Sequence, residues 1–326
     1  MTVLPETPAP DRRVAATRRL AVMAHFDPHG VVAPHVRHCV EAMSDCADEF
    51  VVVSSADLTP ESRAWLGARA ELVVRPNVGH DFASYRAGLD RHDLSRVTEL
   101  VLLNDSTVFP LIPLERVFAH MGPRPADFWG MTMGYGFFPH VQSYFVVFRE
   151  AALRSPAFGA FWRDVGMMGD RSGVISEYEL GLSRALCDDG LRMDSYLRPS
   201  AFDRLEGAAR AGAVAARAFA HDRRWRELLG WARRTVRHAR DPEWNVAAAL
   251  ADRGAHRRVR LPAVKLSTLR DDPYVLDSRR LLAACEARHP DAFAGVREYL
   301  ARTDPAYGGR WARTAGHRPP WLRYRI

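Results

Sequence analysis

The stretch Leu100-Val101-Leu102-Leu103-Asn104-Asp105-Ser106 decides the fold class of this chain. Its apolar half is typical of a buried strand, and the polar tripeptide closes that strand at its carboxyl end. Open α/β sheets bind ligands outside the carboxyl ends of their strands. A carboxylate there can hold a divalent cation or a sugar hydroxyl, although Asn, Asp and Ser are also ordinary turn residues. Asn104, Asp105 and Ser106 are therefore candidate ligand-binding residues.

The chain on either side of this strand alternates between strand and helix patterns. Other strands are predicted at 20–24, 50–53, 71–74, 127–131 and 143–148. Helices are predicted at 32–43, from Thr59, and at 81–89, 114–120, 155–165 and 176–187. This spacing predicts an α/β fold, Rossmann-like, with a mostly parallel sheet flanked by helices.

The pattern becomes mainly helical beyond about residue 200. Helices are expected at 204–240, 243–253, 277–289 and 292–302, with an extended segment at 262–269. We therefore expect a disordered lead at 1–19, an α/β domain at 20–200 and a mainly helical C-terminal region at 201–326.

Composition indicates a globular protein. The 326 residues are 47% hydrophobic and 26% charged. No run approaches the roughly 18 apolar residues of a membrane helix, and the first residues lack a signal-peptide core, so we expect a cytoplasmic protein. The cysteines at 39, 46, 187 and 285 form no CxxC pair. Arginine carries nearly all of the +7 net charge, since Lys265 is the sole lysine.

Several common nucleotide and hydrolase motifs are missing. No G-x-G-x-x-G follows the first strand, and the chain has neither G-x-x-x-x-G-K-[ST] nor G-x-S-x-G. These gaps disfavour a dinucleotide oxidoreductase, a P-loop phosphotransferase and a serine hydrolase of the α/β type.

The loop after the third predicted strand carries further candidates. Gly79 permits close backbone approach, and Asp81 at a helix start could cap that helix or hold a base, a ribose or a metal. Arg86 could face a diphosphate or lie on the surface. His25 and Asp27 follow the first strand. A transition-metal site there is disfavoured because Pro28 interrupts the histidine spacing.

Two more segments hold polar groups. In Ser176-Glu177-Tyr178-Glu179 a capping box accounts for Glu179. Glu177 is left either as a helix-dipole partner or as a base that takes a hydroxyl proton. Strand alternation would send His140, Gln142 and Tyr144 to one face, where they line a pocket or form a polar edge.

Five motifs in order resemble the rhamnan synthesis F family. They are Gly79-His80-Asp81-Phe82-Ala83-Ser84-Tyr85, Leu103-Asn104-Asp105-Ser106, Asp127-Phe128-Trp129-Gly130, Gln142-Ser143-Tyr144-Phe145 and Ser176-Glu177-Tyr178-Glu179-Leu180. Pro262-Ala263-Val264-Lys265 and Leu269-Arg270-Asp271-Asp272-Pro273 echo the family's C-terminal pattern. The family consists of rhamnosyltransferase-like enzymes of bacterial surface polysaccharide assembly.

The resemblance implies a glycosyltransferase of the GT-A type, whose DxD-like tripeptide meets the donor diphosphate. Asn104-Asp105-Ser106 takes that place with one carboxylate, so Asp105 is the candidate ligand of Mg²⁺ or Mn²⁺. Alignment of Leu180 with the pattern of inverting relatives places the base at Glu177. The candidate donor site comprises His25, Asp27, Gly79, Asp81, Arg86, Asn104, Asp105, Ser106 and Lys265. The candidate acceptor or sugar pocket comprises Trp129, His140, Gln142, Tyr144 and Glu179.

The function that this resemblance implies is inverting transfer of a deoxyhexose, L-rhamnose from dTDP-L-rhamnose, onto a glycan or lipid-linked glycan. The alternatives are another nucleotide sugar or a scaffold protein without turnover. The basic segment 204–240 fits an anionic membrane surface at the inner face of the membrane, or an ordinary solvated helix. Its few aromatic residues disfavour nucleic acid as a partner.

Overall fold

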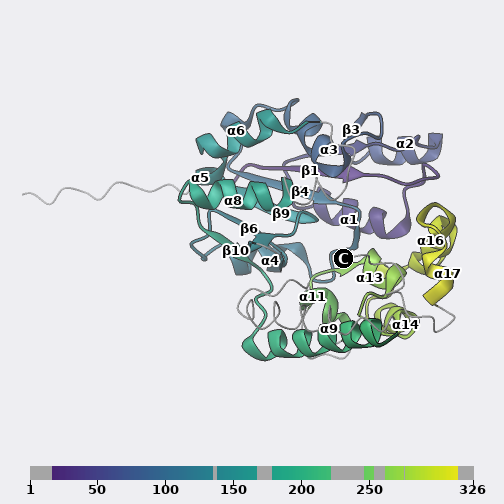
Figure 1. The fold of residues 1–326 in the computed structure, drawn as a ribbon. Coiled ribbons are helices and arrows are strands. Elements are labelled where there is room, and N and C mark those ends of the chain that lie inside the picture. Colours follow the sequence, from purple (N-terminus) through teal and green to yellow (C-terminus); the bar gives the residue numbers. More distant parts are fainter. Residues whose placement is uncertain are drawn as a thin grey trace, which may run out of the picture.

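A seven-stranded mixed sheet forms the centre of the molecule (Figure 1). The computed structural model describes residues 17–134, 138–166, 178–221, 246–252, 261–274 and 276–314. The strand order is β10-β6-β9-β4-β1-β2-β3. The strands are β1 Arg19–His25, β2 Glu49–Ser54, β3 Glu71–Val74, β4 Glu99–Asn104, β6 Phe128–Gly130, β9 Phe145–Arg149 and β10 Met193–Ser195. Only β9 runs antiparallel to its neighbours, β4 and β6.

The register brings the carboxyl ends of three strands to one edge. His25 of β1 lies opposite Ser54 of β2, and Ala24 lies opposite Asn104 of β4. Parallel strands joined by helices reach their ends on the same side. The tripeptide 104–106 therefore lies beside the loop that follows β1.

Apolar side chains on both faces make the sheet an inner layer, as expected for parallel strands. Ala21 and Met23 of β1 join one buried cluster, whereas Leu20 and Val22 join the other. The expected α/β fold with helices on both faces is confirmed. The second cluster is completed by α3 His80–Leu89, α5 Glu150–Leu153, α6 Pro156–Asp164 and α8 Leu180–Asp188.

The helices on the other face come from both ends of the chain. Those from the N-terminal half are α1 Pro34–Ser44, α2 Pro60–Gly67 and α4 Leu114–Met121. Those from the C-terminal part are α13 Leu266–Asp271, α14 Ser278–Arg288, α15 Pro290–Phe293, α16 Val296–Thr303 and α17 Arg310–Thr314. The two parts of the chain thus share one apolar core, and the division near residue 200 stays a prediction.

Two small sheets and several short elements complete the described fold. β5 Thr107–Val108 pairs with β11 Val264–Lys265, and β7 Met133–Gly134 pairs with β8 His140–Val141. The helices α9 Ala201–His221 and α11 Val246–Ala249 contact each other, and α9 runs along the bottom of Figure 1. Single 3-10 turns are found at η1 Leu94–Arg96 and η3 Asp304–Tyr307. Within the described ranges no helix is both long and apolar enough to cross a membrane.

Local sequence signals explain many helix starts. Thr59 accepts a hydrogen bond from Ser62 N, and Ser155 accepts bonds from Ala157 N and Phe158 N. Asp277 caps α14 in the same way through Arg280 N. These caps satisfy main-chain donors that have no partner inside the helix.

Two C-terminal predictions were wrong in detail. The extended segment at 262–269 is reduced to β11, because helix α13 begins at Leu266. The helix predicted at 292–302 is broken at Gly295, whose φ is +68°. A Cβ at Gly295 would come within 2.7 Å of Pro34 Cγ, so this close approach to α1 requires glycine.

Candidate functional site

Asn104 ties the polar tripeptide to the start of α3. Its Oδ1 accepts hydrogen bonds from Ser106 N at 3.1 Å and Ser106 Oγ at 2.6 Å. Its Nδ2 donates to Asp81 Oδ2 at 2.7 Å. Gly79 and His80 reach this point with φ of +81° and +53°, and a left-handed backbone at a residue other than glycine is uncommon. The turn thus places Asp81 beside the end of β4.

Two further motifs meet at the turn before β9. Tyr85 Oη donates to Ser143 O at 2.9 Å, while Ser143 N donates to Glu179 Oε1 at 2.8 Å. Tyr144 O accepts a bond from Asn104 N at 3.2 Å. Four segments that resembled one family in the sequence are therefore joined by hydrogen bonds at one edge of the sheet.

Asp105 is the central acid of this edge. Its Oδ2 accepts a hydrogen bond from Phe26 N at 2.7 Å. Burial raises the pKa of Asp105 to about 8, and the charges of Asp81 and Asp27 act in the same direction. Removing a charge from water and placing it near like charges both disfavour the ionised form. A bound cation would favour that form.

Lys265 lies beside the same tripeptide. In β11 it pairs with Thr107, and the next residue, Leu266, donates its N–H to Ser106 O at 2.9 Å. The Lys265 ammonium lies 5.6 Å from the centre of the Tyr144 ring. The position of the sole lysine is compatible with the expected contact to a donor diphosphate.

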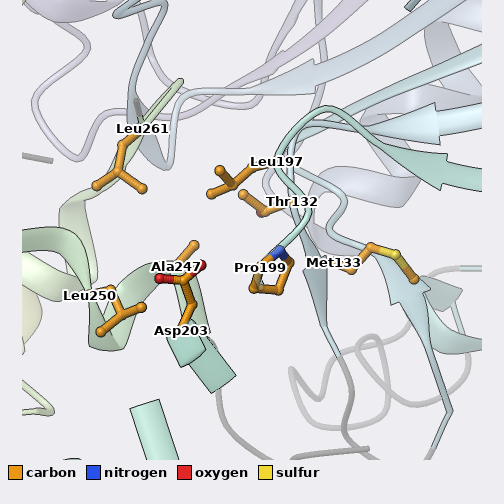
Figure 2. A pocket seen from close by; sticks show the side chains of 8 residues that line it. All are labelled: Thr132, Met133, Leu197, Pro199, Asp203, Ala247, Leu250 and Leu261. Carbon is orange, nitrogen blue, oxygen red and sulfur yellow. The ribbon is translucent and has the colours of Figure 1, made fainter. Parts of the chain in front are cut away.

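A pocket opens next to Lys265. Thr132 Oγ1 donates to Gln142 Oε1 at 2.7 Å and lies 2.9 Å from Tyr144 Oη. These three side chains, Lys265 and Thr268 line about 270 Å³ of empty space together with small apolar residues. A neighbouring pocket of about 350 Å³ shares Thr132 and Ala247 with it. Figure 2 shows its lining, with Thr132 and Leu197 across from Ala247 and Leu250.

Two residues expected in the acceptor pocket have other surroundings. Trp129 is completely buried, with its ring centre 5.8 Å from that of Phe118 and 6.0 Å from that of Phe145. The expectation that it lines a pocket was wrong, because it belongs to the core. His140 is also buried, and its ring lies over Gly134. Residues 142–144 form a turn, so strand alternation does not carry His140 to the face of Gln142 and Tyr144.

Arg86 is held by main-chain oxygens at the end of α6. Its Nη1 donates to Arg163 O at 3.0 Å and to Val165 O, at the end of α6. Its Nε lies 3.6 Å from Asp90 Oδ2. The guanidinium therefore stabilises a helix C-terminus, and the expected contact with a diphosphate stays a prediction.

His25 and Asp27 have structural partners. His25 is 2% exposed, its Nδ1 lies 3.0 Å from Ser54 Oγ, and burial lowers its pKa to about 4. Asp27 Oδ1 and Oδ2 accept bonds from Arg302 at 3.0 and 2.7 Å. Because Asp27 holds the C-terminal helix α16 against the first loop, it is not an open ligand for a donor.

The C-terminal helices bring four residues that sequence reasoning missed. Burial raises the pKa of the Tyr299 and Tyr307 phenols. The negative charge of Asp105 raises both pKa values further, whereas the positive charge of Arg270 lowers them. Arg302 and Arg270 lie 5.7 and 5.9 Å from the centre of the Tyr299 ring. The resemblance of Leu269-Arg270-Asp271-Asp272-Pro273 to the family pattern was the one available signal, and it pointed to α13, which carries Arg270.

Some expectations fall outside the described residues. Glu177, the predicted base, lies in 167–177, and most of the basic segment lies in 222–245. Both roles stay predictions. Among the residues that the structure describes, no three acidic, histidine or cysteine side chains gather as a metal site. Asp105 is thus a candidate ligand only together with other oxygen atoms, such as those of a phosphate.

The α/β fold and its motif-bearing edge define a family of proteins. The chain belongs to the family described as rhamnan synthesis protein F, which it matches over residues 50–222, more than half of its length. The matched range includes the tripeptide 104–106, the turn 142–144 and Glu179. It ends before Lys265 and Arg270.

Curated relatives share part of the chain. An uncharacterized protein, y4gN of Sinorhizobium fredii (strain NBRC 101917 / NGR234), is 29% identical over 187 residues, 55% of this chain and 49% of that protein. The virulence protein VirA of Vibrio anguillarum is 30% identical over 133 residues, 39% of this chain and 42% of that protein. The chain spans about half the length, or less, of these curated relatives.

Solved structures share a weaker likeness. Glucosyl-3-phosphoglycerate synthase from Mycobacterium tuberculosis, in complex with Mn²⁺, UDP-glucose and phosphoglyceric acid, is 13% identical with a TM-score of 0.33, covering 56% of this chain and 71% of that one. A 4-diphosphocytidyl-2C-methyl-D-erythritol synthase from Anaerococcus prevotii is 10% identical with a TM-score of 0.36, covering 55% and 86%. Both scores are below 0.5, so neither likeness says which ligand this chain binds.

Proposed function

We propose that this protein is a GT-A-like glycosyltransferase that transfers L-rhamnose from dTDP-L-rhamnose to a glycan acceptor. The observation that carries the proposal is the convergence of four family motifs around Asp105 at the carboxyl edge of the sheet. That edge is where α/β sheets bind nucleotides. The description of the family as rhamnan synthesis proteins supports rhamnose as the sugar.

The proposed reaction is an inverting displacement. A bond forms between the acceptor oxygen and the anomeric carbon, while the bond from that carbon to the diphosphate oxygen breaks. The electron pair leaves with the diphosphate, and the acceptor proton passes to a carboxylate, for which Glu177 is the candidate. Positive charge near the diphosphate lowers the barrier because it stabilises the leaving group. Lys265, beside Ser106, is placed to supply such charge.

Asp105 and its surroundings fit a divalent cation shared with the donor. Mg²⁺ is commonly held by one or two carboxylates together with substrate phosphates. Burial first, and then the charges of Asp81 and Asp27, raise the pKa of the Asp105 carboxyl group. A cation bound by Asp105 would offset that repulsion and neutralise phosphate charge.

The pocket lined by Gln142, Tyr144 and Lys265 is our proposed sugar or acceptor subsite. Sugar sites combine a few oriented polar groups with apolar walls. Thr132 fixes the side chains of both Gln142 and Tyr144 by hydrogen bonds, so their polar atoms are held in place before a sugar arrives. Preorganised contacts of this kind fix the orientation of a bound ligand.

A donor assay tests the proposal. The purified protein is given dTDP-L-rhamnose, UDP-glucose, GDP-mannose or GDP-fucose, with a rhamnan acceptor and with Mg²⁺ or EDTA, and the released nucleoside diphosphate is measured. We expect dTDP release, lowered about 10²- to 10³-fold by Asp105→Asn. Asp93→Asn is the matched control, since Asp93 caps a 3-10 turn through Ser95 away from the site.

The outcomes separate the alternatives. Release of UDP or GDP instead of dTDP would keep the transferase and replace the donor. Binding of dTDP without release from any donor would favour a scaffold. An equal loss in Asp105→Asn and Asp93→Asn would contradict the role given to Asp105.

A further inference from the structure

Two arginines lie against the same tyrosine ring but differ in their partners. Arg302 and Arg270 have their guanidinium carbons 5.7 and 5.9 Å from the centre of the Tyr299 ring. Arg302 forms a two-pronged ion pair with Asp27, at 3.0 and 2.7 Å. Arg270 forms no ion pair with any residue that the structure describes, and its single hydrogen bond there is a 3.4 Å contact to Thr303 Oγ1.

Arg270 is also the more deeply buried of the two. The residue is 6% exposed, and its Nε has no hydrogen-bond partner among the residues that the structure describes. Its guanidinium carbon lies 3.7 Å from the centre of the Tyr307 ring, so the charge is packed against an aromatic ring. A guanidinium has five N–H donors and is always charged. A buried charge without a partner is strongly destabilising, which indicates that an anion belongs there.

The carboxylates next to Arg270 in the chain are engaged elsewhere. Asp271 lies 3.5 Å from Arg310. Asp272 has a left-handed backbone, with φ of +44°, and accepts bonds from Leu276 N and Ser278 N at the entry to α14. In the Leu269-Arg270-Asp271-Asp272-Pro273 segment, Asp272 therefore serves the turn and Asp271 pairs with α17, so neither acid forms an ion pair with Arg270.

Arg270, which has no ion pair among the described residues, shares two tyrosine neighbours with Asp105. The charges of Asp105 and Arg270 both act on the phenols of Tyr299 and Tyr307, where Asp105 raises the pKa and Arg270 lowers it. The first turn of α13 also carries Thr268, which lines the pocket beside Lys265. The segment from Lys265 to Arg270 thus brings two cations to the edge that the proposed donor would occupy.

We propose that Arg270 binds the diphosphate of the nucleotide donor and stabilises its charge as it leaves, the role that sequence reasoning gave to Arg86. This inference rests on the proposed function. Arginine binds two phosphate oxygens through its planar fork, which suits a diphosphate. The Tyr307 ring packs against the guanidinium at 3.7 Å and so restricts its position.

Calorimetric titration of the full chain tests this assignment. The probes are dTDP, thymidine and inorganic pyrophosphate, and the variants are Arg270→Met and Arg270→Lys. We expect Arg270→Met to weaken dTDP and pyrophosphate binding about 10- to 100-fold, as for lost charged hydrogen bonds, and to leave thymidine binding unchanged. Arg270→Lys should lie in between, because it keeps the charge and loses the fork.

The Tm of the ligand-free protein separates binding from a structural role. Arg270 has no ion pair among the described residues and one long hydrogen bond besides its ring contacts, so we expect Arg270→Met to lower the Tm by less than Arg279→Met does. Arg279→Met is the matched control. Arg279 lies 3.3 Å from the centre of the Trp311 ring and donates to Trp311 O at 2.8 Å, so its loss should lower the Tm and leave dTDP binding unchanged.

Affinity for dTDP within twofold of wild type in both Arg270→Met and Arg270→Lys would overturn the inference. Should Arg270→Met fail to fold, Arg270→Lys decides by the same criterion. If the wild type releases dTDP from the donor and these variants bind it normally, the proposed function stands and the inference fails. If pyrophosphate binding depends on Arg270 but no nucleotide sugar reacts, the anion site stands and the proposed function fails.

Discussion

Replacing Arg302 with glutamine removes both bonds that join α16 to the first loop. The Asp27 side chain, 2% exposed while it is paired, then keeps His29 N and Val31 N as donors to Oδ1, and no other described residue donates to Oδ2. Breaking a buried pair costs about 3–5 kcal/mol, and a hydrogen bond to a charged group is worth about 1.5–3 kcal/mol. Because the Arg302 side chain is 32% exposed, water replaces part of the lost contact. We expect a loss of about 2–3 kcal/mol.

Urea unfolding followed by circular dichroism measures this loss. Arg297→Gln is the control, since Arg297 lies in the same helix and makes a two-pronged pair with Glu286 on the surface. That pair should contribute less than about 1 kcal/mol. A loss in Arg302→Gln within about 0.5 kcal/mol of the control would refute the reasoning, since that is the usual range of surface substitutions.

The pH dependence of the same loss has a definite sign. Burial alone would raise the pKa of Asp27, but the bonds from Arg302, His29 and Val31 lower it below its ordinary value of 3.8. The folded form therefore holds the ionised carboxylate more firmly than the unfolded form does. The stabilisation that the pair of Asp27 and Arg302 gives the folded form is complete above about pH 4 and decreases as the pH falls further. The difference between wild type and Arg302→Gln should shrink over that range.

Two other changes have outcomes set by the described contacts. In Gly130→Ala the new Cβ would lie 2.9 Å from Val141 Cβ and 3.2 Å from Phe145 O, so we expect a loss of about 1–3 kcal/mol by thermal unfolding. Gly159→Ala, whose Cβ would meet nothing within 4 Å, should instead gain up to about 1 kcal/mol, and equal effects would contradict the packing argument. The raised pKa of Asp105, about 8, means that the folded chain keeps a proton which the unfolded chain releases. In EDTA, the urea midpoint of the wild type should fall as the pH rises from about 4 to 8, and that of Asp105→Asn should fall less. Parallel curves for the two proteins would contradict the raised pKa of Asp105.

The strands and the edge tripeptide could be predicted because their signals are local. The apolar run before Asn104 and the capping residue Thr59 each act within a few positions of the chain. The antiparallel direction of β9 could not be predicted, because side-chain alternation is the same in either direction. Trp129 was misplaced since its burial depends on Phe118 and Phe145, which belong to other elements.

The part of the candidate site at the carboxyl edge of the sheet could be predicted from the sequence. The part that the C-terminal helices contribute could not. The spacing of Asp81, Asn104 and Asp105 relative to strand ends was enough to bring them together. Arg270 differs because its burial depends on contacts with Tyr299 and Tyr307, about 30 to 37 residues further on. No local pattern reports such a contact.

The pair between Asp27 and Arg302 also bears on how the chain is made. The two residues are 275 positions apart, and they close the loop after the first strand against almost the last helix described. At synthesis rates of roughly 5–20 residues per second, the partner of Asp27 arrives about 15–55 s after it. Until then, the apolar side of α1 against which α15 packs remains uncovered. The nascent chain thus carries an open apolar surface late into translation, and such a surface is a target for chaperones.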